Sequence, residues 1–213
     1  MKNQFNFAYN LLWWKNSEKT YKLCKHAACT VAGLTSDANI LIEEARLRAG
    51  RYEYQYDEPI PIEQLVESVC NYKQAYTQYG GLRPFGVGFL FAGYDRNHGF
   101  QLYQSDPSGN YSGWKATVIG ANNQAGKSTL KVDYTDESSE GEMPDVVGAL
   151  RLAVKVLNKT MDGTAASPDK IELFVLTLDD DKETIHHKIL TKDETKKIID
   201  QVSADDVAGA GES

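Results

Sequence analysis

The chain has 213 residues, of which 41% are hydrophobic and 25% charged, and its formal net charge is −7. These values are typical of a soluble globular protein with one domain, and the negative charge weighs against a nucleic-acid partner, which would require a clustered basic face. The apolar run at residues 11–14 is far too short to span a membrane, and the three cysteines lack the spacing of a disulfide framework. We therefore expect a cytosolic or nuclear protein.

Two short strands and a helix open the recognisable part of the chain. Residues 21–23 and 27–32 are apolar segments of strand length that lead into Gly33. Thr35 and Ser36 follow and offer an N-cap. Beyond them, apolar residues recur at three- and four-residue spacing, which predicts a helix with one buried face. That face consists of Ala38, Leu41, Ile42, Ala45, Ala49 and Tyr52.

A second helix and a strand with unequal faces come next. The helix begins at Pro61, which suits a first helical turn, and it stops at Gly80 and Gly81. Its apolar positions are Ile62, Leu65, Val66, Val69, Tyr72 and Tyr76. Residues 85–92 place large side chains on one strand face and two glycines, a leucine and an alanine on the other. Because glycines let another layer approach closely, this pattern predicts an inner strand of stacked sheets.

The rest of the chain predicts a strand meander, two helices, a hairpin and a last helix. The predicted elements are strands 100–104 and 114–119, helices 122–134 and 145–161, strands 171–178 and 184–190, and a helix after a capping box formed by Thr191 and Glu194. The tail from residue 204 is small and polar, so we expect it to fray. Short turns imply antiparallel sheets, and helices on both sides predict an α+β sandwich with its sheets inside.

One segment imitates a nucleotide site. Residues 121–128, which end in Gly126-Lys127-Ser128, satisfy a permissive phosphate-loop pattern. A phosphate loop needs free backbone N–H groups, whereas residues from 122 onward are predicted to form a continuous helix that would use them. The neighbouring strands are also hairpin-linked rather than parallel. We therefore keep nucleotide binding only as the weaker alternative.

Cysteines and histidines give no complete metal site. Cys24, His26 and Cys29 resemble part of one, but a closed zinc site needs a fourth ligand and none lies at suitable spacing. We therefore expect structural strand cysteines, with no metal and no cofactor. His186 and His187 are adjacent on a predicted strand, so their side chains point to opposite faces and cannot share an ion.

Three motifs stand in the middle of the chain: Gln-Tyr-Gly-Gly-Leu-Arg-Pro-Phe-Gly-Val at 78–87, Gln-Leu-Tyr-Gln-Ser-Asp-Pro-Ser-Gly at 101–109, and Gly-Trp-Lys-Ala-Thr-Val-Ile-Gly at 113–120. They closely resemble the middle of a proteasome alpha subunit of the type-4 class. Further matches extend the similarity from about residue 17 to about residue 202. The resemblance implies the four-layer alpha-beta-beta-alpha sandwich of the Ntn-hydrolase fold.

The resemblance also implies a role. Alpha subunits form the outer ring of the proteasome core particle and do no chemistry, which implies a noncatalytic structural subunit of ubiquitin-dependent protein degradation in the cytoplasm and nucleus. The implied partners are neighbouring alpha subunits, the beta subunits of the protease ring, and the C-terminal tails of regulatory ATPases or activators. By the same resemblance, the helices in residues 36–79 would help to seat the alpha ring on the beta ring. Lys19 matches the lysine that pairs with the carboxylate of such a tail, and Gly33 and Leu34 match the backbone lining of the same cleft.

The start of the chain departs from this family. Residues 1–16 resemble nothing in it, and the family's opening signature, first helix and first two strands have no counterpart. We expect an incomplete gene model or a truncated isoform, whose exposed sheet edges make the isolated chain poorly soluble. The predicted organisation is an unplaced segment at 1–16, an alpha-subunit-like domain at 17–203 and a flexible tail at 204–213.

A catalytic threonine-protease subunit of the same fold is the main alternative. Such subunits free a threonine by removing a propeptide, and the amine of that threonine then acts as the base. The Gly-Thr pair available here is Gly163–Thr164. Cleavage there would leave only residues 164–213, which are too few to build the double sheet.

Overall fold

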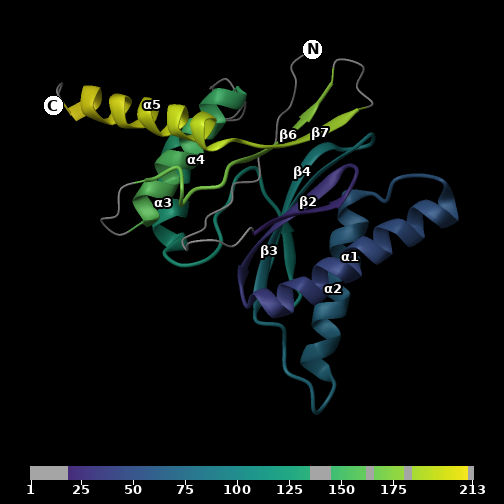
Figure 1. The fold of residues 1–213 in the computed structure, drawn as a ribbon. Helices are drawn as coiled ribbons and strands as arrows, with labels where there is room; N and C mark the ends of the chain where they lie inside the picture. The colour runs from purple at the N-terminus through teal and green to yellow at the C-terminus, as the bar shows by residue number, and fades with distance from the viewer. Residues whose placement is uncertain (1–18, 135–144, 162–165, 180–183, 211–213) are drawn as a thin grey trace.

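The computed structural model describes residues 19–134, 145–161, 166–179 and 184–210, with side chains as far as residue 204 (Figure 1). Its elements in chain order are β1 (Thr20–Cys24), β2 (Ala27–Gly33), α1 (Thr35–Tyr56), α2 (Ile62–Gln78), β3 (Val87–Asp95), β4 (Gly99–Ser105), β5 (Tyr111–Gly113), α3 (Asn123–Asp133), α4 (Val146–Thr160), β6 (Phe174–Leu178), β7 (Ile185–Ile189) and α5 (Lys192–Ala210). No helix in these ranges has the length and apolar character that crossing a membrane requires.

One antiparallel sheet runs through the middle of the molecule in the order β1-β2-β3-β4-β5. β3 is its central strand, and Val31 of β2 pairs with Phe89 of β3. β6 and β7 form a separate antiparallel hairpin, in which Leu176 pairs with His187. The antiparallel arrangement and the hairpin agree with the sequence prediction.

The two faces of β3 differ as the sequence predicts. Val87, Phe89 and Phe91 lie in the core under α1 and α2, and the two phenyl rings stack with their centroids 5.2 Å apart. Leu90 and Ala92 point to the opposite side and pack in a second cluster. The helical residues buried against the first face are Ala38, Leu41, Ile42, Ala45 and Ala49 of α1, and Ile62, Leu65, Val66 and Val69 of α2. The predicted faces of both helices are therefore confirmed.

The other face of the sheet is covered by a second β layer and then by helices. Leu176 of β6 packs on Ala28 of β2 and Phe100 of β4. Val118 packs against α3 and α4, and Val175 of β6 packs against α4 and α5. Figure 1 shows α1 and α2 on one side of the sheet and α3, α4 and α5 on the other. The layers therefore follow the order α-β-β-α, as an α+β sandwich of the Ntn type requires.

Residues 114–119 do not form the strand that the sequence predicts. β5 covers only Tyr111–Gly113, and a hydrogen bond from the Trp114 N–H to the Leu102 carbonyl, at 2.9 Å, continues it. The rest of the segment is held by side chains packed between the sheet and the helices. Val118 and Ile119 are buried and Trp114 is exposed, but the backbone of the segment finds no strand partner within the described ranges.

Two helix ends also differ from prediction. Thr35 and Ser36 lie inside α1, whose N-cap position is Leu34 and which has no side-chain cap. At the other end of the chain, α5 extends to Ala210, into the segment that we expected to fray. The capping box before α5 is confirmed: the Thr191 N–H donates to Glu194 Oε2 at 2.9 Å, and the Glu194 N–H donates to Thr191 Oγ1 at 3.3 Å.

The strand predicted at residues 85–92 starts later, at Val87. The backbone of Gly86 is used elsewhere, since its N–H donates to Asp37 Oδ2 at 2.8 Å and its carbonyl accepts from the Leu34 N–H at 2.9 Å. The start of α1 therefore takes the hydrogen bonds that a longer strand would have used.

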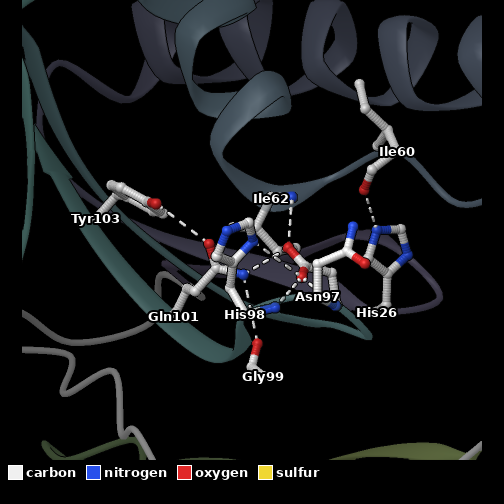
Figure 2. Close-up of polar contacts among 9 residues, drawn as sticks. His26, Ile60, Ile62, Asn97, His98, Gly99, Gln101 and Tyr103 are labelled. Carbon is white, nitrogen blue, oxygen red and sulfur yellow. Dashed lines mark hydrogen bonds and ion pairs between the residues drawn. The ribbon is translucent and has the colours of Figure 1, made fainter.

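Asp95, at the end of β3, ties the sheet to α2. Figure 2 labels Ile62, Asn97, His98 and Gln101, which donate to its carboxylate. Its carboxylate accepts the N–H groups of Ile62 at 3.4 Å, Asn97 at 3.0 Å and His98 at 2.7 Å. Gln101 Nε2 donates to the same carboxylate. Burial alone would raise the pKa of Asp95, but these hydrogen bonds outweigh it and hold the pKa below its ordinary value. One side chain thus orders both the β3–β4 turn and the first turn of α2.

Candidate functional site

Lys19, Gly33 and Leu34 lie at the same end of the β1–β2 pair. Lys19 directly precedes β1, and its carbonyl accepts from the Val31 N–H at 3.3 Å. Because the two strands are antiparallel, the start of β1 lies beside the end of β2, where Gly33 closes the strand and Leu34 precedes α1. We call the group Lys19, Gly33 and Leu34 the β1–α1 corner.

A close approach of two backbones shapes this corner. Gly33 has a φ of 131°, and a Cβ atom there would lie 2.2 Å from the carbonyl oxygen of Gly86. The neighbouring Leu34 donates its N–H to that same carbonyl, while its side chain stays 53% exposed. Glycine is therefore required at position 33, where the two backbones are in direct contact.

An ion pair fixes the first turn of α1 beside the corner. Asp37 is buried, and its carboxylate accepts from Arg83 Nη1 at 2.7 Å and Nη2 at 2.8 Å. The Arg83 hydrogen bonds, together with the Gly86 N–H, lower the pKa of Asp37 to about 2. The negative charge of Asp37 is thus compensated locally and opposes the approach of another anion only weakly.

A lysine and the start of a helix meet at the corner. Partial burial lowers the pKa of the Lys19 ammonium from its ordinary value. α1 starts at the corner without a side-chain cap, and the start of a helix carries partial positive charge on its backbone N–H groups. A cation beside such a helix start is suited to a charge-assisted contact with an anionic chain end.

The phosphate-loop pattern has a different structure. Gly126, Lys127 and Ser128 lie inside α3, and the Gly126 N–H donates to the Asn122 carbonyl at 3.4 Å. Lys127 Nζ lies 5.5 Å from the centroid of the Trp114 ring. The helix uses the backbone N–H groups that a phosphate would need, so the nucleotide-binding alternative is wrong on geometry.

The other candidate residues are placed as follows. His186 and His187 do point to opposite faces of β7, where His186 Nε2 lies 2.8 Å from Asp179 Oδ2 and His187 Nε2 lies 2.8 Å from the Lys25 carbonyl. Among the residues that the structure describes, no three metal-ligating side chains come together. Thr164, the nucleophile of the catalytic alternative, lies outside the described residues, as do residues 1–16.

Lys73 is an unusual residue that the sequence prediction missed. It lies on α2 and is fully buried, with Nζ donating to Ser105 Oγ at 3.0 Å and 5.2 Å from the centroid of the Phe89 ring. Burial lowers its pKa to about 8. The signal was present in the spacing, because Lys73 follows Val69 by four residues and precedes Tyr76 by three, on the apolar face of the helix.

The layered fold is that of an Ntn-type α+β sandwich. Comparison with known proteins agrees with this class. The sequence model described as "Proteasome subunit" matches residues 6–176. Proteasome subunit alpha type-4-A of Arabidopsis thaliana is 54% identical over 184 residues, covering 86% of this chain and 71% of the relative. Proteasome subunit alpha type-4 of Spinacia oleracea is 60% identical over 158 residues, covering 74% of this chain and 61% of the relative. The chain therefore belongs to the proteasome subunit family.

Proposed function

We propose that this chain is a noncatalytic alpha-type subunit of the outer ring of the proteasome core particle. The similarity to alpha type-4 subunits supports the alpha type, and family membership implies assembly with other proteasome subunits. The proposal assigns neighbouring alpha subunits and the beta ring as its partners in ubiquitin-dependent protein degradation in the cytoplasm and nucleus. Its structural support is a contact surface on α1.

Three apolar side chains line the solvent-facing side of α1 at seven-residue spacing. They are Ile40, Leu47 and Tyr54, which are 53%, 59% and 94% exposed. Residues seven apart on a helix lie on the same side, so the three form one stripe. An exposed stripe of this kind is typical of a helix that packs against a partner. We assign the α1 stripe, defined by these three residues, to the beta subunits on which the ring is seated.

Assembly of the ring tests this assignment. A charge in the α1 stripe, as in Leu47→Glu, should lower incorporation of the tagged full chain into core particles at least about tenfold, since it would bury an unpaired carboxylate. Val132→Glu on α3 is the matched control, because Val132 is also apolar and exposed and α3 lies on the other side of the sheet from α1 (Figure 1). Native gels measure incorporation. Equal incorporation of the two variants would refute the assignment.

We further propose that the β1–α1 corner receives the C-terminal carboxylate of a regulatory ATPase or activator tail. Support comes from the position of Lys19 at the end of the β1–β2 pair from which α1 starts without a side-chain cap, and from the compensated charge of Asp37. Core particles assembled with Lys19→Ala should bind a tail peptide about tenfold more weakly, whereas Lys22→Ala, which changes an exposed lysine on β1, should leave binding unchanged. If amidation of the peptide carboxylate weakens binding but Lys19→Ala does not, the carboxylate is held elsewhere.

The noncatalytic assignment has its own test. Thr164 is the threonine that the catalytic alternative would need, so Thr164→Ala in assembled particles should leave every peptidase activity at the wild-type level. Loss of one activity, together with a processed N-terminal threonine detected by mass spectrometry, would instead establish a catalytic subunit.

A further inference from the structure

A histidine joins the β6–β7 hairpin to the first sheet. His187 lies on β7 opposite Leu176 of β6 and on the same face as Ile185, and this face packs on the first sheet. Its Nε2 atom is 2.8 Å from the carbonyl oxygen of Lys25, in the turn between β1 and β2. A side chain of the second β layer is thus bonded to the backbone of the first.

This hydrogen bond fixes where the neutral imidazole carries its hydrogen. A carbonyl oxygen only accepts, so Nε2 of His187 must be the protonated nitrogen. Nδ1 then keeps its lone pair, and it is buried without a hydrogen-bond partner among the described residues. A second proton would have to bind Nδ1, where it would create a buried N–H group that has no acceptor.

The imidazole lies against apolar side chains. The ring centroids of His187 and Phe174 are 5.7 Å apart. Phe174 belongs to the apolar cluster between the two β layers, together with Ala28 of β2, Phe100 of β4 and Leu176 of β6. An imidazolium in this position would lose more hydration free energy than the neutral ring does.

Nearby charges also disfavour a protonated ring. Burial is the main cause that lowers the pKa of His187, and Lys22, His26 and His186 act in the same direction through their charges. The hydrogen bond to the Lys25 carbonyl acts the other way, but it does not reverse the shift in pKa. Other ionisable side chains around the contact include Asp179, which pairs with His186, Glu53, which pairs with Lys25, Lys188, which pairs with Glu194, and Tyr94 of the apolar cluster.

We propose that His187 is an acid-sensitive contact, which holds the β6–β7 hairpin on the first sheet while its imidazole is neutral and releases the hairpin when Nδ1 binds a proton. In the released state, water solvates the imidazolium and accepts from both of its N–H groups, so protonation favours release. A two-stranded hairpin that packs on nothing is at best marginally stable, so its own backbone hydrogen bonds open as well. The contact is thus a pH-dependent conformational switch between the two β layers.

The direction of the pH dependence follows from the lowered pKa. Because the folded chain binds the His187 proton more weakly than the released chain does, the contact contributes its full stability above the ordinary pKa of 6.5. That stability is lost as the pH falls below 6.5 toward the lower pKa of the folded state. Release of the hairpin therefore accompanies acidification.

Hydrogen exchange in the folded full chain tests the proposal. The probes are the backbone amides that pair β6 with β7, together with Leu190, whose N–H donates to the Leu173 carbonyl at 2.8 Å. Amides of β3, at the centre of the first sheet, are the internal reference. Between about pH 7.5 and about pH 5, after correction for the intrinsic effect of pH on exchange, protection of the hairpin should fall at least about fivefold more than that of β3.

Substitutions of two adjacent histidines identify the group that titrates. His187→Gln can still donate an amide N–H to the Lys25 carbonyl but binds no proton in this pH range, so the extra loss of hairpin protection should disappear. His186→Gln is the matched control, because His186 points to the opposite face of β7 and pairs with Asp179. In that variant the extra loss should remain.

Three results would overturn the proposal: no extra loss of hairpin protection relative to β3 in the wild type, an extra loss that persists in His187→Gln, or one that disappears in His186→Gln. If His187→Gln does not fold, titration of the wild-type imidazole by NMR decides. Half-protonation of His187 below pH 6.5, over the range in which hairpin protection falls, supports the proposal. Half-protonation at or above pH 6.5 contradicts it.

Discussion

Arg83 donates hydrogen bonds of 2.7 and 2.8 Å to the two carboxylate oxygens of Asp37, and these bonds join the loop before β3 to the first turn of α1. Asp37 is buried, so the pair is more than a surface contact. It also positions Gly86, whose N–H donates to the same carboxylate. The pair therefore fixes the position of Gly86, whose carbonyl lies against Gly33 of the β1–α1 corner.

Breaking this pair should destabilise the protein. Arg83→Ala leaves a buried carboxylate without its cation, and we expect a loss in the free energy of unfolding, measured with urea at pH 7, that clearly exceeds the loss in an exposed pair. Glu43→Gln is the control, since Glu43 pairs with Arg46 on the exposed surface of α1 and should contribute less than about 0.5 kcal/mol. Similar losses in the two variants would show that the Asp37–Arg83 pair contributes no more to stability than an exposed ion pair does.

The same pair predicts a pH dependence. The pKa of Asp37 is about 2 in the fold, below its ordinary value of 3.8, so the folded state favours the charged carboxylate. The resulting stability is fully present above pH 3.8 and is lost as the pH falls toward 2. The difference in unfolding free energy between wild type and Asp37→Asn should therefore shrink over that window. A constant difference would contradict the assigned shift.

Gly33 and Gly50 form a matched pair of glycines. Gly33→Ala should destabilise by about 2–4 kcal/mol, because φ is 131° and the new Cβ would lie 2.2 Å from the Gly86 carbonyl oxygen. Gly50→Ala should stabilise by about 0.5–1 kcal/mol, since Gly50 lies within α1 and a Cβ there meets nothing within 4 Å. Thermal unfolding of both variants checks the prediction, which fails if the two substitutions shift the melting temperature in the same direction.

Lys73 should limit stability at neutral pH. Its pKa is about 8 in the fold and 10.5 in the unfolded chain, so the unfolded state binds the proton more tightly. Wild-type stability should therefore rise with pH between 8 and 10.5, and below that window the full penalty applies. Lys73→Met removes the charge but retains the shape of the side chain, and we expect a gain of about 1–2 kcal/mol at pH 7 that fades by pH 10.5.

Lys73→Ala provides the contrast for that prediction. It also removes the charge, but it leaves a cavity next to Phe89 and should be less stable than Lys73→Met. Urea denaturation at several pH values distinguishes the two. If Lys73→Met is less stable than the wild type at pH 7, then the hydrogen bond to Ser105 outweighs the burial penalty.

Local patterns were reliable where the interacting residues are neighbours in the chain. The apolar faces of α1 and α2 follow from side-chain spacing, and the Thr191–Glu194 capping box has both hydrogen bonds that its sequence predicts. Prediction failed where pairing depends on distant residues. Residues 114–119 have the composition of a strand but gain no ladder within the described ranges, and Asp37, which finds Arg83 46 positions later, was not foreseen at all.

The sequence by itself determined the succession of helices and strands, the buried face of each, and membership of the proteasome subunit family, since these depend on residue spacing and on motifs within short segments. Only the tertiary structure decided which polar groups meet: Arg83 with Asp37, Lys73 with Ser105, and Cys24 with an imidazole fixed by Ile60. The physical reason is that the Arg83–Asp37 and Lys73–Ser105 contacts join segments that are far apart in the chain. The contact of Cys24 with His26 is local, but the Ile60 carbonyl that orients the imidazole comes from a distant segment. Burial and hydrogen bonding then set the charges of the groups that meet.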